Sequence, residues 1–195
     1  MPKEIEIKFR VTDVRSLTQK LRATGFRLRT PRTYEMNTLY DLPGGILRNR
    51  KELLRIRKYG STWTLTHKSG KKIGRHSSRI ELETEVADGQ TLDAILHALG
   101  YSPSFRYEKF RSEWIDGKIA QKKPGKRVIV VDETPIGNFC EIEGPPRWID
   151  ATAKKLGVRP EDYITKNYAT LFAEWKTETK STTTEMMFRA ERSKR

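Results

Sequence analysis

Several short stretches of this chain place charged residues at every second position. Side chains alternate between the two faces of a β-strand, so each stretch predicts a strand with one charged and one apolar face. Carboxylates bind hard cations such as Mg²⁺, and Lys and Arg side chains bind phosphate oxygens. Acidic rows beside basic rows therefore indicate a site for a metal ion and a triphosphate. The charged rows contain Glu4, Glu6, Lys8, Arg55, Arg57, Lys68, Glu81, Glu83, Glu85, Lys109, Arg111, Glu141 and Glu143.

An ordinary surface strand is the alternative interpretation of any one of these stretches, because a strand with a solvated face also alternates. A solvated face normally mixes the two signs of charge. Here most rows carry a single sign, since residues 81–85 contribute three acids whereas residues 55–57 contribute two arginines. This separation favours one shared, enclosed site over several solvated surfaces.

The composition predicts one folded domain with phosphate-bearing partners. The 195 residues, 35% of them hydrophobic, are enough for a single domain with a core. Lys and Arg total 39 against 25 Asp and Glu, which gives a formal net charge of +14. The single cysteine, Cys140, excludes an internal disulfide. Because no signal-peptide core or membrane-length apolar run is present, we expect a cytoplasmic protein without membrane contact.

Helices must support the charged strands. Apolar residues at helical spacing, with Asp, Pro or Gly at the ends, predict four helices over residues 13–25, 92–99, 145–157 and 160–175. The last of these carries an apolar stripe over residues 164–175, which is typical of core packing. The helices are therefore expected to cover the apolar faces of the strands.

Domain organisation follows from the same patterns. We expect one domain over residues 1–175 and a flexible polar and basic tail over residues 176–195. Residues 69–78 are rich in Gly and Lys and predict an exposed hairpin loop, without the spacing of a phosphate-binding P-loop. A weak repeat at an offset of 75 positions, from Ile5 to Ile80 onward, indicates two related halves.

The number of strands suggests how the charged faces come together. About eight antiparallel strands are enough to close a barrel, and a barrel wide enough for a ligand can have a polar interior. The apolar faces would then point outward, under the helices. We therefore expect an α+β fold, in which a closed antiparallel eight-stranded barrel with a charged interior is flanked by helices.

The motifs also resemble a known family. Residues 4–8 form an ExExK signature, followed in order by RIR at 55–57, WTLTHK at 63–68, EKFR at 108–111 and EIE at 141–143. This series is similar to that of the CYTH superfamily, the triphosphate tunnel metalloenzymes. The resemblance covers residues 1 to about 172. Stretches 99–105 and 137–144 resemble the class IV adenylate cyclase branch more than the thiamine triphosphatases.

The resemblance implies a role for each charged residue, with Mg²⁺ or Mn²⁺ as cofactor. The implied metal ligands are Glu4, Glu6, Glu141 and Glu143, with Asp132 beside them and Glu83 or Glu85 as further members. The implied triphosphate ligands are Lys8, Arg55, Arg57, Lys68, Lys109 and Arg111, with Lys166 as an additional candidate. The residues expected to be catalytic are Glu6, Lys8, Arg57, Lys68, Lys109 and Arg111.

Three functions remain open at this stage. A cyclase would convert ATP to cyclic AMP and pyrophosphate, with metal ions at the attacking hydroxyl and the leaving group. A triphosphatase would hydrolyse inorganic, thiamine or nucleoside triphosphate at the same site. A non-catalytic binder of polyphosphate or nucleic acid would fit the net charge, but the acidic rows would repel a nucleic-acid backbone. The sequence does not indicate the oligomeric state, and a homodimer is left open.

Overall fold

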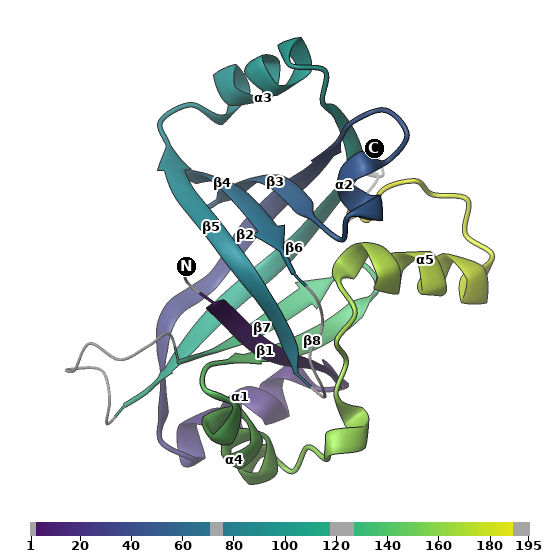
Figure 1. Ribbon diagram of the computed structural model, residues 1–195. Helices are drawn as coiled ribbons and strands as arrows, with labels where there is room; N and C mark the ends of the chain where they lie inside the picture. Colours follow the sequence, from purple (N-terminus) through teal and green to yellow (C-terminus); the bar gives the residue numbers. More distant parts are fainter. Residues whose placement is uncertain (1–2, 71–75, 118–126, 189–195) are drawn as a thin grey trace, which may run out of the picture.

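The computed structural model describes residues 3–70, 76–117 and 127–188 (Figure 1). Eight antiparallel strands form a closed barrel in the order β1-β5-β4-β3-β2-β6-β7-β8. The predicted barrel is therefore confirmed. The strands are β1 (Lys3–Val11), β2 (Phe26–Asp41), β3 (Leu53–Tyr59), β4 (Thr62–Ser69), β5 (Ser77–Val86), β6 (Ser102–Asp116), β7 (Val128–Thr134) and β8 (Gly137–Glu143).

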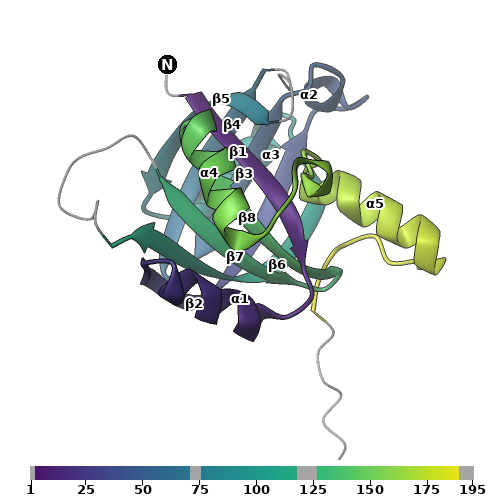
Figure 2. The ribbon, with the colours of Figure 1, turned by 90° about the horizontal axis from the view of Figure 1, so that it is seen from below.

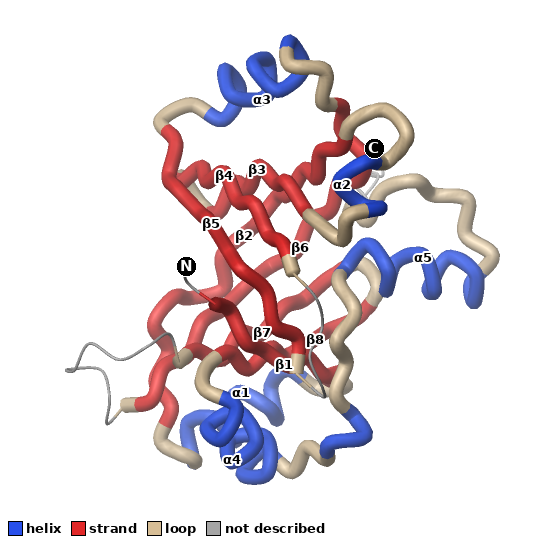
Figure 3. Tube along the Cα trace, viewed as in Figure 1, coloured by secondary structure: helices blue, strands red, loops and turns tan. Residues whose placement is uncertain are grey.

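Helices lie outside the barrel, as Figures 2 and 3 show. The helices are α1 (Val14–Ala23), α2 (Ile46–Asn49), α3 (Gly89–Ala98), α4 (Pro146–Leu156) and α5 (Tyr168–Thr179), with a 3₁₀ turn at Pro160–Asp162. Three of the longer helices in the described part of the chain, α1, α3 and α5, begin at a residue whose side chain accepts from a free backbone N–H group, whereas α4 begins with Pro145 and Pro146. The carboxylates of Asp13 and Asp88 accept from backbone N–H groups at the starts of α1 and α3. No helix in the described part of the chain is long and apolar enough to span a membrane.

The hydrophobic core lies between the barrel and its helices. Ile7 and Ile142, on the outer faces of β1 and β8, are fully buried in one cluster with Leu21 of α1 and Ile149 of α4. A second cluster lies under α5 and a third under α3. Since the apolar faces are used on the outside, the charged faces are left to line the interior.

The last helix begins later than the sequence predicted. Residues 160–162 form a 3₁₀ turn, and α5 begins at Tyr168. Between them, Ile164 exchanges two backbone hydrogen bonds with Lys8, of 3.1 and 2.7 Å. The predicted stripe nevertheless holds as a packing surface, because Ile164 contacts the same core cluster as Leu171 and Phe172. Residues 163–167 are therefore not helical, although their apolar spacing predicted a helix, and Ile164 in this segment pairs with β1 of the barrel.

Part of the segment 176–195, for which the sequence predicts a flexible tail, has regular structure among the described residues. Helix α5 continues to Thr179, and the backbone of Met186 pairs with β6, to Arg106 at 3.0 Å and to Glu108 at 2.9 Å. Strand β7 pairs with β6 only from Phe110 onward, so this edge of β6 needs other partners. Residues 71–75 of the predicted hairpin loop lie outside the described residues, whereas residues 77 and 78 belong to β5 and are buried.

Candidate active site

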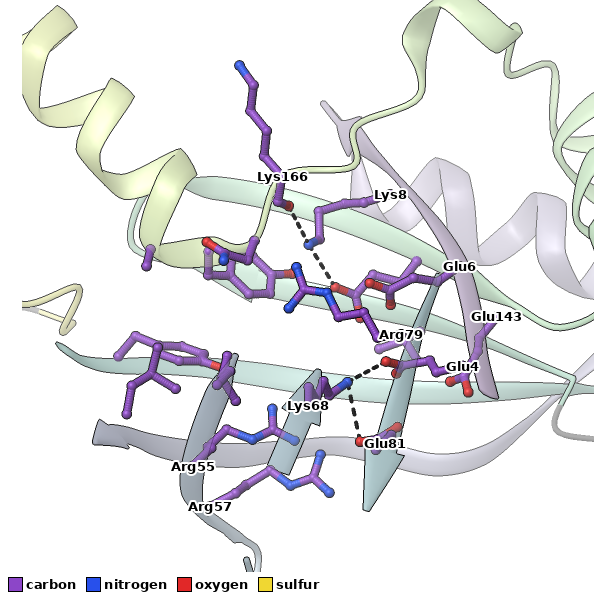
Figure 4. A pocket seen from close by; sticks show the side chains of 18 of the residues that line it. Glu4, Glu6, Lys8, Arg55, Arg57, Lys68, Arg79, Glu81, Glu143 and Lys166 are labelled. Carbon is purple, nitrogen blue, oxygen red and sulfur yellow. Dashed lines mark hydrogen bonds and ion pairs between the residues drawn. The ribbon is translucent and has the colours of Figure 1, made fainter. Parts of the chain in front are cut away.

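The barrel encloses a cavity of about 110 Å³ whose walls carry charged side chains of both signs (Figure 4). Its described lining contains eight basic and six acidic residues, so a triphosphate would meet repulsion from the acids unless a cation covered them. The basic residues are Lys8, Arg55, Arg57, Lys68, Arg79, Lys109, Arg111 and Lys166, and the acidic ones are Glu4, Glu6, Glu81, Glu83, Glu141 and Glu143.

Lys8 of β1 is held at the centre of one wall. Its Nζ lies 3.1 Å from Oε1 of Glu141 and donates to the backbone carbonyl of Lys166 at 3.3 Å. The same Nζ lies 4.2 Å from the centre of the Tyr168 ring. Burial alone would lower the pKa of Lys8 and raise the pKa of Glu141. Their mutual attraction outweighs burial, so the pKa of Lys8 is raised, that of Glu141 is lowered, and both groups stay charged.

Lys109 and Arg111 of β6 belong to a buried ion-pair network. Nζ of Lys109 lies 2.9 Å from Asp132 and 3.3 Å from Glu35. Arg111 donates two hydrogen bonds of 2.7 Å to Asp132, which also accepts from the Tyr168 hydroxyl at 2.6 Å. Burial tends to raise the pKa of Glu35, but the two cations hold it well below its usual range. The carboxylates behind the wall thus fix the two cations in place.

Another part of the cavity wall is formed by strands β3, β4 and β5. Nη2 of Arg57 donates to both carboxylate oxygens of Glu83 at 3.0 Å, and its Nε donates to Thr64 at 3.3 Å. Nη2 of Arg55 donates to Thr66 at 3.2 Å. The Nε atom of Arg55 is buried and finds no hydrogen-bond acceptor among the described residues. An unsatisfied buried cationic donor is costly, so Arg55 is prepared to bind an anion.

Three carboxylates gather near the junction of β1 and β8. Glu6 and Glu143 are directly opposed in the strand pairing, and Figure 4 shows Glu4 beside them. Burial raises the pKa of Glu6 to about 7, and the negative charges of Glu141 and Glu4 add to this rise. A carboxylate that resists ionisation for these reasons would be relieved by a divalent cation.

The donor set fits Mg²⁺ or Mn²⁺, which prefer carboxylate oxygens. The groups are not yet assembled around such an ion. Glu4 accepts a 2.6 Å hydrogen bond from Lys68. In the described part of the chain, no three carboxylate, imidazole or thiol groups are gathered closely enough to hold a metal ion as they stand. A metal ion bound by Glu4 would therefore compete with the Lys68 ammonium for that carboxylate.

Some predicted site residues lie elsewhere. Asp132 does not line the cavity and is surrounded by donors, and Glu85 is exposed and also absent from the lining. Glu83 lines the cavity but is engaged by Arg57. The side chain of Lys166 points away from the cavity (Figure 4), and its Nζ lies 2.6 Å from Glu174 on the surface. Only the backbone carbonyl of Lys166 contacts a charged group of the site.

Two charged residues of the interior were missed from the sequence. Glu35 is fully buried behind Lys109, and its signal was the alternation of Glu35 and Asn37 in β2. Arg79 lines the cavity from β5 and has no ion pair with any described residue. It continues the row of residues 81 and 83 by one inward position, but the Gly- and Lys-rich stretch 69–78 before it gives no signal for where the strand begins.

Comparison with known proteins supports the fold and the family. A candidate adenylate cyclase from Methanocaldococcus jannaschii is 26% identical over 141 residues, which are 72% of this chain and 75% of that protein. The crystal structure of a candidate adenylate cyclase from Vibrio parahaemolyticus matches with a TM-score of 0.75 and 17% identity, covering 88% of this chain and 98% of that chain.

A plant relative has the same fold. The structure of an adenylyl cyclase candidate from Hippeastrum, described as having a dominant triphosphatase activity, has a TM-score of 0.59 and 20% identity. The alignment covers 90% of this chain and 96% of that one. The family model of the CYTH domain matches residues 2–168, so nearly all of the barrel and its supporting helices fall within the match. The chain therefore belongs to the CYTH domain family.

Proposed function

We propose that this chain is a divalent-metal-dependent enzyme that converts ATP to cyclic AMP and pyrophosphate, in the manner of class IV adenylate cyclases. The observation that carries the proposal is the shared cavity, in which the Glu6–Glu143 pair faces the same space as Arg55 and Arg57. Acids for a metal ion and bases for phosphate oxygens are both required for this chemistry. The candidate adenylate cyclase of M. jannaschii, at 26% identity, supports this assignment.

The basic side chains would bind and orient the triphosphate. Lys109 and Arg111 are fixed by Asp132 and Glu35, so they would meet the phosphate oxygens without losing side-chain freedom. Arg55 would supply its unsatisfied Nε. Such fixed charges stabilise the negative charge that develops as the α-phosphorus is attacked. Lys8, Arg57 and Lys68 line the same cavity and would complete the grip.

The acidic side chains would hold Mg²⁺ or Mn²⁺. Glu4, Glu6, Glu141 and Glu143 line the cavity and are our proposed ligands. When bound, the metal would lower the pKa of the attacking ribose 3′-hydroxyl and neutralise the leaving pyrophosphate. Asp132, Glu83 and Glu85 are not needed for this set. Asp132 acts instead on the orientation of Lys109 and Arg111.

Triphosphate hydrolysis is the second candidate. It is favoured by the Hippeastrum protein, whose description combines a cyclase name with a dominant triphosphatase activity. The same grip would then present the terminal phosphorus to water. The two reactions differ in which end of the triphosphate meets the nucleophile.

A product assay tests both candidates. The purified chain is incubated with ATP and, separately, with tripolyphosphate, each with Mg²⁺ or Mn²⁺. Cyclic AMP with pyrophosphate is expected from ATP, whereas orthophosphate would show the hydrolase. If neither ATP nor tripolyphosphate is turned over with Mg²⁺ or with Mn²⁺, the proposed catalysis is overturned and a binding role is left.

A matched pair of variants tests the site. Arg57→Ala removes a cation that lines the cavity, whereas Lys58→Ala removes the adjacent, exposed cation on the opposite face of β3. We expect turnover to fall at least about a hundredfold in Arg57→Ala, as when a fixed charge partner of the transition state is lost. Lys58→Ala should keep near-normal turnover. Equal effects of the two changes would remove the cavity as the active site.

A further inference from the structure

The C-terminal segment 181–188 leaves the end of α5 and returns to the barrel, and Figure 1 shows it in yellow. The backbone of Met186 occupies part of the β6 edge that β7 leaves free. Two residues further on, the Phe188 N–H donates to the Glu108 carboxylate at 2.9 Å. The family match ends at residue 168, so this segment lies beyond the matched domain.

Met186 packs with two tyrosines of the cavity lining. Its side chain is 1% exposed and belongs to one buried cluster with Tyr107 and Tyr168. Met186 and Tyr107 are paired in a parallel bridge, so their side chains point to the same side of the sheet. Both tyrosines line the charged cavity, and their ring centres are 5.7 Å apart. The C-terminal segment is therefore packed against part of the lining itself.

Tyr168 is placed to orient two lysines. Its ring centre lies 4.2 Å from Nζ of Lys8 and 5.0 Å from Nζ of Lys109. The face of an aromatic ring attracts an ammonium group, most strongly where water is excluded. The Tyr168 hydroxyl donates to Asp132, the carboxylate that also accepts from Lys109. One side chain thus holds two ammonium groups that repel each other.

Tyr107 has the corresponding position beside Arg55. Burial would lower the pKa of Arg55, but its hydrogen bond to Tyr107 is among the interactions that raise this pKa. The Tyr107 ring is 5% exposed and is stacked on that of Phe105, with ring centres 5.5 Å apart. A side chain enclosed by Phe105, Tyr168 and Met186 has few alternative rotamers. The C-terminal segment therefore reaches three of the proposed phosphate ligands through two tyrosines.

We propose that residues 181–188 support the phosphate-binding side of the cavity. Met186 fixes the rings of Tyr107 and Tyr168, and these tyrosines are positioning residues. The cations that they position are Arg55, Lys8 and Lys109. The inference rests on the proposed triphosphate-binding function and adds a role for a segment outside the charged strands. A change at Met186, which makes no phosphate contact, should therefore alter the affinity for the anion, because misplaced cations bind phosphate oxygens less well.

The first test changes Met186 in the intact chain. Met186→Ala removes its contacts with the tyrosines, whereas Met186→Leu keeps an apolar side chain of similar volume. The matched control is Leu17→Ala, because Leu17 of α1 is buried in the separate cluster that includes residues of α1 and α4. Leu17 is not among the described residues that line the cavity. Both alanine changes remove a buried apolar side chain, but only Met186→Ala acts on the tyrosines.

Dissociation constants for tripolyphosphate with Mg²⁺ are measured by calorimetry, well below the melting temperature of every variant. Misfolded protein lowers the number of binding sites per chain in such a titration, whereas misplaced cations raise the dissociation constant. We expect Met186→Ala to raise it about tenfold or more, because charged hydrogen bonds from three cations are weakened together. Met186→Leu and Leu17→Ala should stay within about twofold of the wild-type value.

Two changes at Tyr168 test the link to the lysines, whatever the stability of Met186→Ala. Tyr168→Phe keeps the ring beside both lysines, and Asp132 keeps its hydrogen bonds from Lys109 and Arg111. Its affinity for tripolyphosphate should therefore fall less than about threefold. Tyr168→Leu removes the ring and should weaken binding about tenfold or more, since both lysines lose the aromatic face.

Each other outcome has a separate meaning. Equal dissociation constants in Met186→Ala and Leu17→Ala, or wild-type binding by Tyr168→Leu, overturn the supporting role while the cavity proposal stands. A loss in Tyr168→Phe as large as that in Tyr168→Leu overturns positioning through the ring. Failure of the wild-type protein to bind tripolyphosphate overturns the proposed function of the cavity, and the supporting role with it.

Discussion

At the scale of single residues, this molecule keeps charged groups in its interior by giving nearly every one a partner. Lys109, Asp132 and Glu35 are each no more than 1% exposed. Burial of an unpaired charge is costly, and hydrogen-bonded opposite charges offset that cost. For Glu6 the balance is unfavourable, because burial and the nearby charges of Glu141 and Glu4 outweigh the attraction of the neighbouring lysines and raise its pKa to about 7.

The raised pKa of Glu6 predicts how stability depends on pH. A carboxyl group whose pKa is higher in the folded state than in the unfolded chain destabilises the fold when it is ionised. This penalty is absent below about pH 4.5, grows up to about pH 7 and is complete above it. Glu6→Gln should therefore raise the unfolding free energy of the metal-free protein at pH 8, by up to about 3 kcal/mol. Thermal unfolding in EDTA at pH 5 and pH 8 measures the difference.

Exposed Glu161 supplies the control, because Glu161→Gln should have no comparable effect at either pH. Mn²⁺ should stabilise the wild-type protein at pH 8 and have less effect on Glu6→Gln. A variant that is equally or less stable than the wild type in EDTA at pH 8 would show that Glu6 is already balanced by other charges.

The partners of Lys109 and Arg111 give a second prediction. Asp132 accepts hydrogen bonds from both cations and from Tyr168, all of them buried or partly buried. Asp132→Asn leaves the cations with less negative charge and should lower the unfolding free energy by about 3–5 kcal/mol, as when one member of a buried pair is removed. Glu113→Gln, which breaks the exposed pair with Arg29, should cost less than about 1 kcal/mol.

Urea unfolding at pH 7 compares the two variants directly. A loss in Asp132→Asn as small as that in Glu113→Gln would mean that Glu35 alone holds Lys109 and Arg111. In that case Asp132 would contribute little to the arrangement of the cavity.

At the scale of elements, alternation along the strands was enough to predict the barrel and most of its lining. Period-two patterns depend only on which face a side chain takes, so Glu6, Arg57 and Glu143 could be assigned to the interior without coordinates. The repeat was also informative, because α1 and α3 both begin after an aspartate that caps the helix. A groove beside the cavity, between α2 and the first turns of α5, could not be predicted. It arises from loops and helix ends, whose sequences carry no periodic pattern.

Errors came from segments whose local pattern did not match their structure. Ile164 has helical spacing with Tyr168, but backbone pairing with Lys8 holds it extended. Lys166 lines the cavity, but its side-chain Nζ lies beside Glu174, an orientation that the charge of the residue does not predict. Arg79 was not predicted as a cavity residue, because the sequence gives no clear signal for where a strand begins after a Gly-rich loop. In each case a tertiary contact decided the outcome.

The segment after α5 carries a prediction at this scale. Met186 is 1% exposed, packs in the cluster under α5 and adds backbone hydrogen bonds to the free edge of β6. Met186→Ala should lower the unfolding free energy by about 2–5 kcal/mol, through lost contacts and the cavity left behind. Thr182→Ala, at an exposed position of the same segment, should change it by less than about 0.5 kcal/mol. Denaturant unfolding of both variants provides the comparison. Equal stability of the two would mean that the segment is only loosely attached to β6.

At the scale of the whole molecule, the formal net charge of +14 and the charged cavity are different features. The described cavity lining is nearly balanced, with eight basic and six acidic residues. Ten of the fourteen excess positive charges belong to residues 71–75, 118–126 and 189–195, which lie outside the described residues. Among the described residues, exposed cations outside the cavity include Arg15 of α1 and Lys154 and Lys155 of α4. An exterior field can attract anions from a distance, but contacts in the cavity must hold them.

This distinction predicts the effect of removing exterior charge. Replacing Arg15, Lys154 and Lys155 together by Gln should change the dissociation constant for tripolyphosphate less than about threefold at 0.15 M salt, because exposed charges more than about 8 Å away are screened. Arg57→Ala should weaken binding by about ten- to a hundredfold, since a charged hydrogen bond contributes about 1.5–3 kcal/mol. Titrations at 0.05 and 0.3 M salt, with and without Mg²⁺, measure both effects.

Two results together would place the anion-binding surface on the exterior. The triple variant would lose as much affinity for tripolyphosphate as Arg57→Ala, and Arg57→Ala would keep wild-type binding to a DNA duplex. The barrel would then serve only as a scaffold. The enclosed position of Arg57 and the unsatisfied Nε of Arg55 argue for the opposite result, in which the exterior sets how fast the anion arrives and the cavity sets how tightly it stays.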